Sequence, residues 1–223
     1  MLKKIKNLQK NNNLFYELIL GVLTASLFSA FIYLEHFGFT IKILNTFFGL
    51  SALTLFLYIP KKSIFVAGFA IGLLWFYWIG YSFEYQGVAY MTPIITFAFG
   101  IIYMLFFGVL ALTNKVYIRA ILLFALCFFE PFDWNWLQIE LIFVDSYIGI
   151  YKYQLASILL ALSLIYYIKK PYKYASFVLL LLAINFNPAN QKLTELKIKL
   201  VTTDIKQEKS GYEKVKTYCF THL

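Results

Sequence analysis

Long apolar stretches separated by short polar connections occupy residues 14–186 of the chain. A helix needs about 20 mostly apolar residues to cross the hydrocarbon core of a bilayer. Lipid offers no partner for backbone N–H and C=O groups, so such stretches are expected to be helical. Seven are recognisable, covering residues 14–34, 41–59, 64–83, 91–113, 116–129, 153–168 and 172–186. The fifth and seventh have lengths that are also typical of buried or re-entrant segments.

The composition narrows the class of protein. Of the 223 residues, 61% are apolar and 21% aromatic, and only 14% are charged. A soluble domain is normally about a quarter charged, so a soluble globular protein is close to excluded, and disorder requires low hydrophobicity. The two cysteines, Cys127 and Cys219, do not make a disulfide scaffold. The sequence therefore predicts an all-α integral membrane protein, a bundle of about seven transmembrane helices.

The location of the charges predicts how the bundle is oriented. The net charge is +9, and the cations gather in alternate connections between the predicted spans. One set of connections carries eleven cations: Lys3, Lys4, Lys6, Lys10, Lys61, Lys62, Lys115, Arg119, Lys169, Lys170 and Lys173. The other set carries only Lys42 and Lys152, beside the acids Glu35, Glu84, Glu130, Asp133, Glu140 and Asp145. This pattern indicates a membrane and not a nucleic acid as the partner of the cations.

The positive-inside rule converts this asymmetry into a domain organisation. Residues 1–13 are expected to form a basic cytoplasmic N-terminus, and residues 14–186 a polytopic transmembrane domain. Residues 187–223 are then expected outside the cytoplasmic membrane, which requires all seven spans.

The third predicted span contains small residues and a cluster of aromatic ones. Gly68, Gly72 and Gly80 share one helix face, a pattern that lets another helix approach closely. We expect packing inside the bundle, with dimerisation as the alternative. The aromatic residues at its outer end are typical of an interfacial belt. A lipid site at the same place would use Trp78, Tyr81 and Glu84.

The connection of residues 130–151 mixes four acids with two tryptophans and many aliphatic side chains. It is too polar to span the bilayer and too apolar for a solvated linker, so it is expected to be an interfacial or re-entrant segment. Two interpretations stay open. It is either a structural lid over the bundle or a region of substrate contact that includes Trp134, Trp136 and Gln138.

Other polar residues of the spans offer little chemistry. Glu17 and Arg119 lie near span ends, where both side chains are expected to reach the interface as tolerated charges. Cys127 is expected to pack as a small apolar residue, and His36 to be solvated. The sequence has no nucleotide-binding loop and no metal-ligand spacing, so no cofactor and no metal are predicted.

The composition changes at residues 187–190, a turn-forming cluster followed by a polar tail. Residues 196–200 alternate as a half-buried strand does. A single strand in a tail this short has nothing to pair with, so the sequence is expected to begin an α/β domain without completing it. Cys219 and His222 are not expected to form a catalytic pair.

Three stretches, in order, resemble the bacterial apolipoprotein N-acyltransferases. Residues 68–72 match a G-F-x-x-G pattern in a membrane span of that family, and Trp136-Leu137-Gln138 match its outer-loop W-L-Q, although Asn135 replaces a usual proline. Residues 197–207 resemble the first strand of the periplasmic nitrilase-like domain, which ends in Asp-Ile-x-Gln. The resemblance covers essentially the whole chain.

This resemblance implies a place and an activity. Members of the family lie in the bacterial inner membrane and transfer an acyl chain from phospholipid to the N-terminal amine of a diacylglyceryl-cysteine lipoprotein. A Glu base, an oxyanion-stabilising Lys and a Cys nucleophile carry the reaction in the nitrilase-like domain. No residue here matches that triad, since Glu208, Glu213 and Cys219 are too close to the first strand. The expectation is a truncated or frameshifted product, inactive alone.

Two other functions remain open. A small polytopic transporter would show polar residues facing a cavity at the bilayer midplane, whereas the hydroxyls of Thr24, Thr54 and Ser163 more often bond to their own helix. A structural membrane subunit would pair with a separately encoded catalytic fragment.

Overall fold

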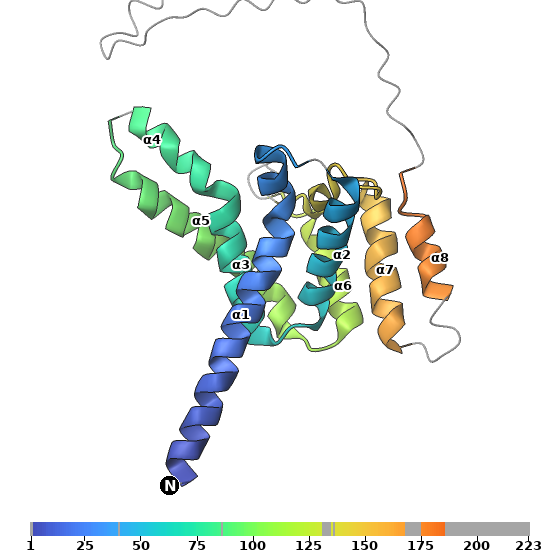
Figure 1. Ribbon diagram of the computed structural model, residues 1–223, viewed down its shortest axis with the longest axis horizontal. Helices are drawn as coiled ribbons and strands as arrows, with labels where there is room; N and C mark the ends of the chain where they lie inside the picture. The colour runs from blue at the N-terminus through green and yellow to red at the C-terminus, as the bar shows by residue number, and fades with distance from the viewer. Residues whose placement is uncertain are drawn as a thin grey trace, which may run out of the picture. The chain divides into compact units, whose positions relative to one another are not determined.

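The computed structural model describes residues 2–39, 41–85, 87–130, 135, 137–167 and 175–185 (Figure 1). Within these ranges the chain is helical, and the only β pairing is an isolated antiparallel bridge between Ile148 and Ile184. The compact unit of residues 1–186 contains every described element. The predicted strand at 196–200 and the tail residues Cys219 and His222 lie outside the described residues.

Eight α-helices and three shorter 3-10 helices make up the described part of the chain. In chain order they are α1 (Leu2–His36), α2 (Lys42–Tyr58), α3 (Lys61–Phe76), η1 (Tyr77–Tyr81), α4 (Ser82–Tyr85), α5 (Met91–Gly108), η2 (Val109–Leu112), α6 (Val116–Leu126), η4 (Ile139–Phe143), α7 (Lys152–Tyr167) and α8 (Ala175–Leu181).

Three stretches are long and apolar enough to cross a membrane: Asn13–His36, Lys61–Tyr81 and Met91–Leu112. Three more apolar helices are shorter, namely Lys42–Tyr58, Val116–Leu126 and Lys152–Ile165. Each coincides with a predicted span, and α8 lies within the seventh. The prediction of an integral membrane bundle of helices is therefore confirmed, while the number of full crossings stays a prediction.

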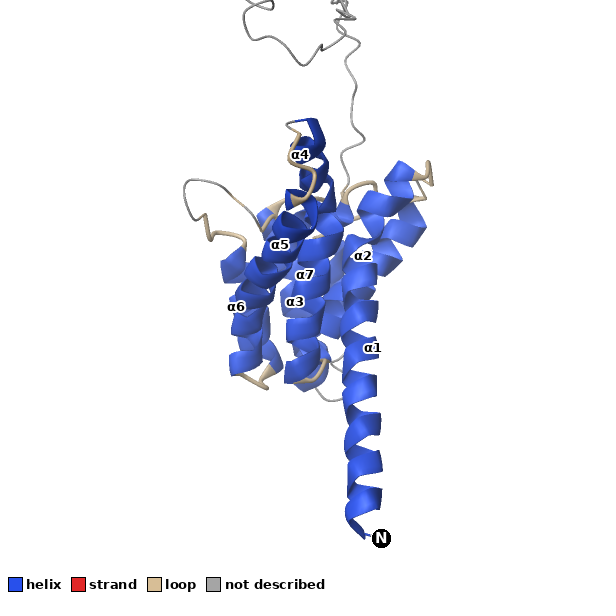
Figure 2. Cartoon of the chain, turned by 90° about the vertical axis from the view of Figure 1, so that its left-hand side faces the viewer, coloured by secondary structure: helices blue, strands red, loops and turns tan. Residues whose placement is uncertain are grey.

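The connections between helices gather at two ends of the bundle (Figures 1 and 2). The α2–α3 and η2–α6 connections lie at one end, which we call the lysine end after Lys61, Lys62 and Lys115. The α1–α2, α4–α5 and α6–α7 connections lie at the other, which we call the acidic end after Glu35 and Glu130. The alternation of charge along the sequence thus becomes a separation in space.

Close approach of α3 to α5 depends on missing side chains. A Cβ atom at Gly68 would lie 2.8 Å from the Tyr103 carbonyl oxygen and 3.0 Å from Met104 Cα. A Cβ at Gly72 would meet the Phe99 carbonyl and lie 2.9 Å from Gly100 Cα. The predicted role of these glycines in packing inside the bundle is confirmed, because both face a helix of the same chain.

Aromatic rings fill the space that this close packing encloses. Phe28 of α1 contacts Phe56 of α2 edge-on at 5.3 Å between centroids and stacks on Trp75 of α3 at 5.6 Å. Phe107 of α5 contacts Phe28 and Phe56 from the other side. Rings from four helices therefore meet in one cluster, at separations that favour edge-to-face and offset contacts.

Helix α6 is too short to cross the bilayer by itself. Its 11 residues rise about 16 Å at 1.5 Å each, against about 30 Å of hydrocarbon. The carbonyl of Cys127, just past its end, accepts hydrogen bonds from Lys152 Nζ at 3.0 Å and from Asn135 Nδ2 at 3.3 Å. Polar side chains thus satisfy a backbone carbonyl at the end of this short helix.

The segment after α6 folds back over the bundle. Leu137, Ile139, Ile142 and Phe143 are buried, and η4 packs against α1 and α2. A Cβ at Gly49 of α2 would lie 2.6 Å from the Phe143 ring. Asn45 Nδ2 donates to the carbonyls of Val144 and Asp145 at 3.3 and 3.4 Å. The described residues of this segment therefore form a packed lid on α1 and α2, and substrate contact at its outer surface stays a prediction.

Two charged residues lie in more protected surroundings than their sequence positions suggested. The Arg119 side chain is buried at the lysine end, with 3% exposed, and it hydrogen-bonds to backbone carbonyls. Glu17 is also mostly covered, with 20% of its side chain exposed, and it pairs with Lys62 at 3.6 Å. Both side chains therefore have bonding partners near the lysine end, carbonyl oxygens for Arg119 and the exposed ammonium of Lys62 for Glu17.

Hydroxyls within the spans behave as expected of helical residues. Thr24 Oγ1 donates to the Leu20 carbonyl and Thr54 Oγ1 to the Leu50 carbonyl, both at 2.7 Å, and Ser163 Oγ donates to Leu160 at 2.9 Å. These side chains are committed to their own helices, which gives no support to a polar transport path through them.

Candidate functional site

The aromatic residues predicted as a lipid site lie where α3 changes its geometry at the acidic end. At Phe76 the helix gives way to η1, a tighter 3-10 turn, which leads into α4. Trp78 is 59% exposed and Tyr81 is 51% exposed. The structure therefore brings these two predicted residues together on one turn, with their rings available to surroundings outside the chain.

The exposed indole of Trp78 has its polar atom satisfied. Its Nε1 donates to the Trp75 carbonyl at 2.8 Å. A tryptophan whose N–H is already bonded can place the rest of its ring among lipid chains without leaving a donor unpaired. Tyr81 contacts Tyr77 edge-on at 6.0 Å, and Tyr77 stacks on Tyr33 of α1 at 6.4 Å.

Helix α5 holds this turn in place. Thr92 Oγ1 donates to the Gly80 carbonyl at 2.8 Å, and the Thr92 side chain occupies the space that a Cβ at Gly80 would need. Below it, Phe76 stacks on Phe99 at 4.6 Å. The α3–α5 pair thus extends as an arm toward the acidic end, carrying η1 and α4 (Figure 1).

The predicted polar contacts of this site are only partly described. Glu84 lies in α4, next to the exposed turn, but its side chain falls outside the described residues, as does Gln86. Trp134 and Trp136 also lie outside the described part. Gln138 is exposed just before η4, so it belongs to the lid.

The predicted site residues at the aromatic turn and those at the lid pack against different helices. The turn that carries Trp78 and Tyr81 packs mainly against α5, whereas η4, which follows Gln138, packs against α1 and α2. The structure brings together the first pair and leaves Gln138 on a separate surface at the same end.

Three chemically active side chains meet beneath the lid, and sequence reasoning missed two of them. The Cys127 thiol interacts electrostatically with Glu140 of η4 and with Lys152 of α7. Lys152 Nζ also lies 4.3 Å above the centre of the Phe128 ring. Glu140 is 7% exposed, and its Oε2 has no hydrogen-bond partner among the described residues.

This cluster holds the lid and does not offer a reactive thiol. Cys127 is fully buried, and its Sγ contacts the Leu123 carbonyl at 3.7 Å. A substrate has no exposed sulfur to meet, while Lys152 and Glu140 link α7 and η4 to the end of α6. The available signal was Lys152, one of two cations on the acidic side, whose position there predicts a specific partner.

Within the described residues, no three His, Cys, Asp or Glu side chains are grouped as ligands for a metal ion. The arrangement at the acidic end therefore offers exposed aromatic rings, a packed lid and polar anchors, which suit the binding of an amphipathic molecule.

Comparison with known proteins identifies the family to which this helical bundle is similar. Residues 15–186 match the model of the apolipoprotein N-acyltransferase integral membrane domain. The chain belongs to this family. The match begins within α1 and extends to the residue after the last described one, so it covers the lid and all the helices of the bundle.

Curated relatives agree with the family assignment. An apolipoprotein N-acyltransferase of Wolinella succinogenes is 34% identical over 185 residues, covering 82% of this chain and 45% of the relative. One of Campylobacter jejuni is 33% identical, covering 88% and 46%, and one of Helicobacter hepaticus is 31% identical, covering 74% and 42%. No solved structure gives a significant match. The chain spans somewhat less than half the length of these relatives.

Proposed function

We propose that this chain is the membrane-embedded part of an apolipoprotein N-acyltransferase and presents phospholipid and lipoprotein to the reaction at its acidic end. The observation that carries the proposal is the family match, which extends over the whole described bundle from residue 15 to residue 186. The exposed aromatic turn and the lid supply surfaces for amphipathic substrates.

The charges support an orientation in the bacterial inner membrane. The lysine end, with residues 1–13, faces the cytoplasm by the positive-inside rule, and the acidic end faces the periplasm. Seven crossings carry the chain to the periplasmic side, the fifth and seventh made by α6 and α8 together with the residues that flank them in the predicted spans 116–129 and 172–186. Residues 187–223 then begin the nitrilase-like domain, as the resemblance of residues 197–207 to its first strand suggests.

Trp78 and Tyr81 are the residues we assign to the acyl donor. Amphipathic aromatic rings settle at the level of lipid headgroups, and η1 holds both rings outward. Glu84 is placed to contact the headgroup, and Trp134, Trp136 and Gln138 to contact lipid or lipoprotein at the lid. The acyl transfer itself requires the Glu, Lys and Cys of the nitrilase-like domain, on the same polypeptide or on a separate partner.

A chimera tests the assignment. Residues 15–186 would replace the matching segment of the Wolinella succinogenes relative, and the purified protein would be given a phospholipid with a labelled acyl chain and a synthetic diacylated lipopeptide. The chimera is expected to label the lipopeptide amine, and the present chain by itself is expected to give no product. A chimera that is folded in detergent yet inactive, or turnover by the chain alone, would contradict the proposal.

The donor site is tested in the same chimera. Replacing Trp78 and Tyr81 by alanine is expected to lower kcat/KM for the phospholipid about fivefold to tenfold, the loss of about 1 to 1.5 kcal/mol of aromatic contact. Tyr16→Ala is the control, since Tyr16 is 60% exposed near the start of the apolar stretch Asn13–His36, far along α1 from the acidic end. If the control and the double variant lowered kcat/KM equally, the acyl-donor site would not lie at η1.

A further inference from the structure

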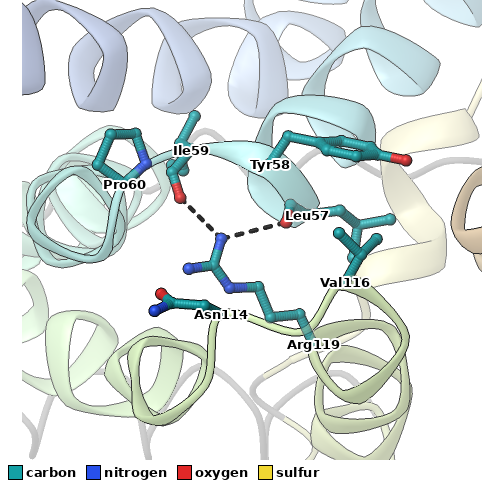
Figure 3. Close-up of a pocket in the computed structure, with 7 residues that line it drawn as sticks. All are labelled: Leu57, Tyr58, Ile59, Pro60, Asn114, Val116 and Arg119. Carbon is teal, nitrogen blue, oxygen red and sulfur yellow. Dashed lines mark hydrogen bonds between the residues drawn. The ribbon is translucent and has the colours of Figure 1, made fainter. Parts of the chain in front are cut away.

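A buried cation at the lysine end has hydrogen bonds but no acid. Arg119 of α6 is 3% exposed. Its Nη1 donates to the carbonyls of Leu57 and Ile59 at 3.1 and 2.7 Å (Figure 3). Its Nε donates to the Thr113 carbonyl at 3.0 Å. Arg119 therefore fastens the end of α2 to the start of α6.

Carbonyl oxygens accept hydrogen bonds from two of the three guanidinium nitrogens of Arg119 but leave its charge without a counterion. In the described part of the chain, the ion pair within 4.0 Å is Lys62–Glu17, and no acid pairs with Arg119. Burial of a charge without an opposite charge is costly. The Leu57 and Ile59 carbonyls lie at the carboxyl end of α2, where the helix dipole favours a cation. An anion would add the full opposite charge that these carbonyls do not supply.

The remaining nitrogen of the guanidinium faces an open pocket. Nη2 makes no hydrogen bond to the described residues, whereas the other two nitrogens are occupied. The pocket has a volume of about 310 Å³, and its walls include Tyr58, Pro60, Asn114 and Val116. Figure 3 shows the Asn114 side chain on the side of the guanidinium away from the Leu57 carbonyl, where its amide adds a second polar group.

The surroundings of the pocket favour a phosphate. Lys61 and Lys115 lie beside it at the ends of the flanking connections, and Lys115 is exposed. Lys61 Nζ reaches the Leu112 carbonyl at 3.4 Å, across the same two connections. Arginine forks bind phosphate oxygens in a fixed geometry, and basic pockets between membrane helices bind anionic headgroups. The apolar wall formed by Leu57, Tyr58 and Val116 suits the glycerol and upper acyl region of a lipid.

We propose that the pocket of Arg119 and Asn114 binds the phosphate of an anionic phospholipid in the leaflet at the lysine end. The bound phosphate supplies the counterion that Arg119 lacks and joins α2, α3 and α6 at their shared corner. This lipid is separate from the acyl donor assigned to Trp78 and Tyr81, because the two sites lie at opposite ends of the bundle.

The test uses the purified full chain in detergent and measures phosphatidylglycerol retained per protein by native mass spectrometry. The double variant Asn114→Leu, Lys115→Gln changes exposed residues and keeps Arg119 as the helix anchor. It is expected to weaken phosphatidylglycerol binding about tenfold, equivalent to about 1.4 kcal/mol. Lys42→Gln, the same loss of charge at the acidic end, is expected to leave binding unchanged.

Two further binding measurements distinguish a bound lipid from a bound free phosphate ion. Phosphatidylcholine, whose headgroup is neutral overall, is expected to bind more weakly than phosphatidylglycerol, and inorganic phosphate at millimolar concentration is expected not to displace the lipid. The proposal is overturned if Lys42→Gln and the double variant lose lipid equally, if phosphatidylcholine binds as well, or if inorganic phosphate competes. Arg119→Lys adds a second reading, because retention of full binding without the planar fork would also overturn it.

Discussion

Single residues decide how closely the helices of this bundle approach. Gly68 and Gly72 place the backbone of α3 against that of α5, and the spacing of the two glycines was visible in the sequence because it repeats within one helix. The hydrogen bonds of Arg119 to α2 were not visible, since these two carbonyl partners lie 60 and 62 residues away. Local pattern predicts a face of a helix, whereas the partner of a side chain depends on how distant segments fold together.

Adding one methyl group at Gly68 tests the close approach. Gly68→Ala would put a Cβ 2.8 Å from the Tyr103 carbonyl oxygen, and overpacking of this kind costs about 1 to 3 kcal/mol. The thermal midpoint of the chain in detergent is therefore expected to fall. Ala89→Val, which enlarges an exposed residue of the α4–α5 connection, is the control. An unchanged midpoint for Gly68→Ala would show that α3 and α5 do not pack here.

At the scale of elements, the sequence predicted the spans of the arm formed by α3 and α5 but did not predict the 3-10 turn that ends α3. The apolar length of residues 64–83 predicted one span, and Lys61–Tyr81 is long and apolar enough to cross. The change to a 3-10 turn after Phe76 was not predicted, because it follows from contacts with α5 such as the hydrogen bond of Thr92 to Gly80. The turn in its exposed position is what brings Trp78 and Tyr81 together.

Removing the hydrogen bond from Thr92 to the Gly80 carbonyl is expected to loosen η1, while a side chain of the same shape still fills the space beside Gly80. Thr92→Val keeps the shape of the side chain and deletes the hydroxyl that donates to Gly80. A hydrogen bond contributes about 1 kcal/mol, so amide exchange of residues 77–81 is expected to be about fivefold faster. Thr96→Val makes the same change one turn further along α5. If both variants exchange alike, Thr92 does not hold the turn.

The lid was also predicted from the sequence only in part. Its mixed composition predicted an interfacial segment, and η4 is indeed packed on α1 and α2. The cluster of Cys127, Glu140 and Lys152 was not predicted as a unit, since its members belong to the end of α6, to η4 and to the start of α7. None of these residues stands out in the sequence, because they come together only in the fold, where the lid covers the end of the short helix α6.

For the whole molecule, charge placement is the feature that sequence predicts best. Within the described residues, the connections that carry Lys61, Lys62 and Lys115 lie at the opposite end of the bundle from those that carry Glu35 and Glu130 (Figures 1 and 2). Lys152 departs from the pattern, and its ammonium group contacts the Cys127 carbonyl and the Phe128 ring. The separation of charge supports the proposed orientation, on which the positions of both lipid sites depend.

Labelling of single cysteines tests this orientation most directly. In a background with Cys127→Ala and Cys219→Ala, the variants Gln138→Cys and Lys115→Cys place one thiol at the acidic end and one at the lysine end, both at exposed positions. A membrane-impermeant maleimide is then added to intact spheroplasts and to lysed ones. The account predicts that the Gln138→Cys variant is labelled in intact spheroplasts and the Lys115→Cys variant only after lysis. The reverse pattern would contradict it.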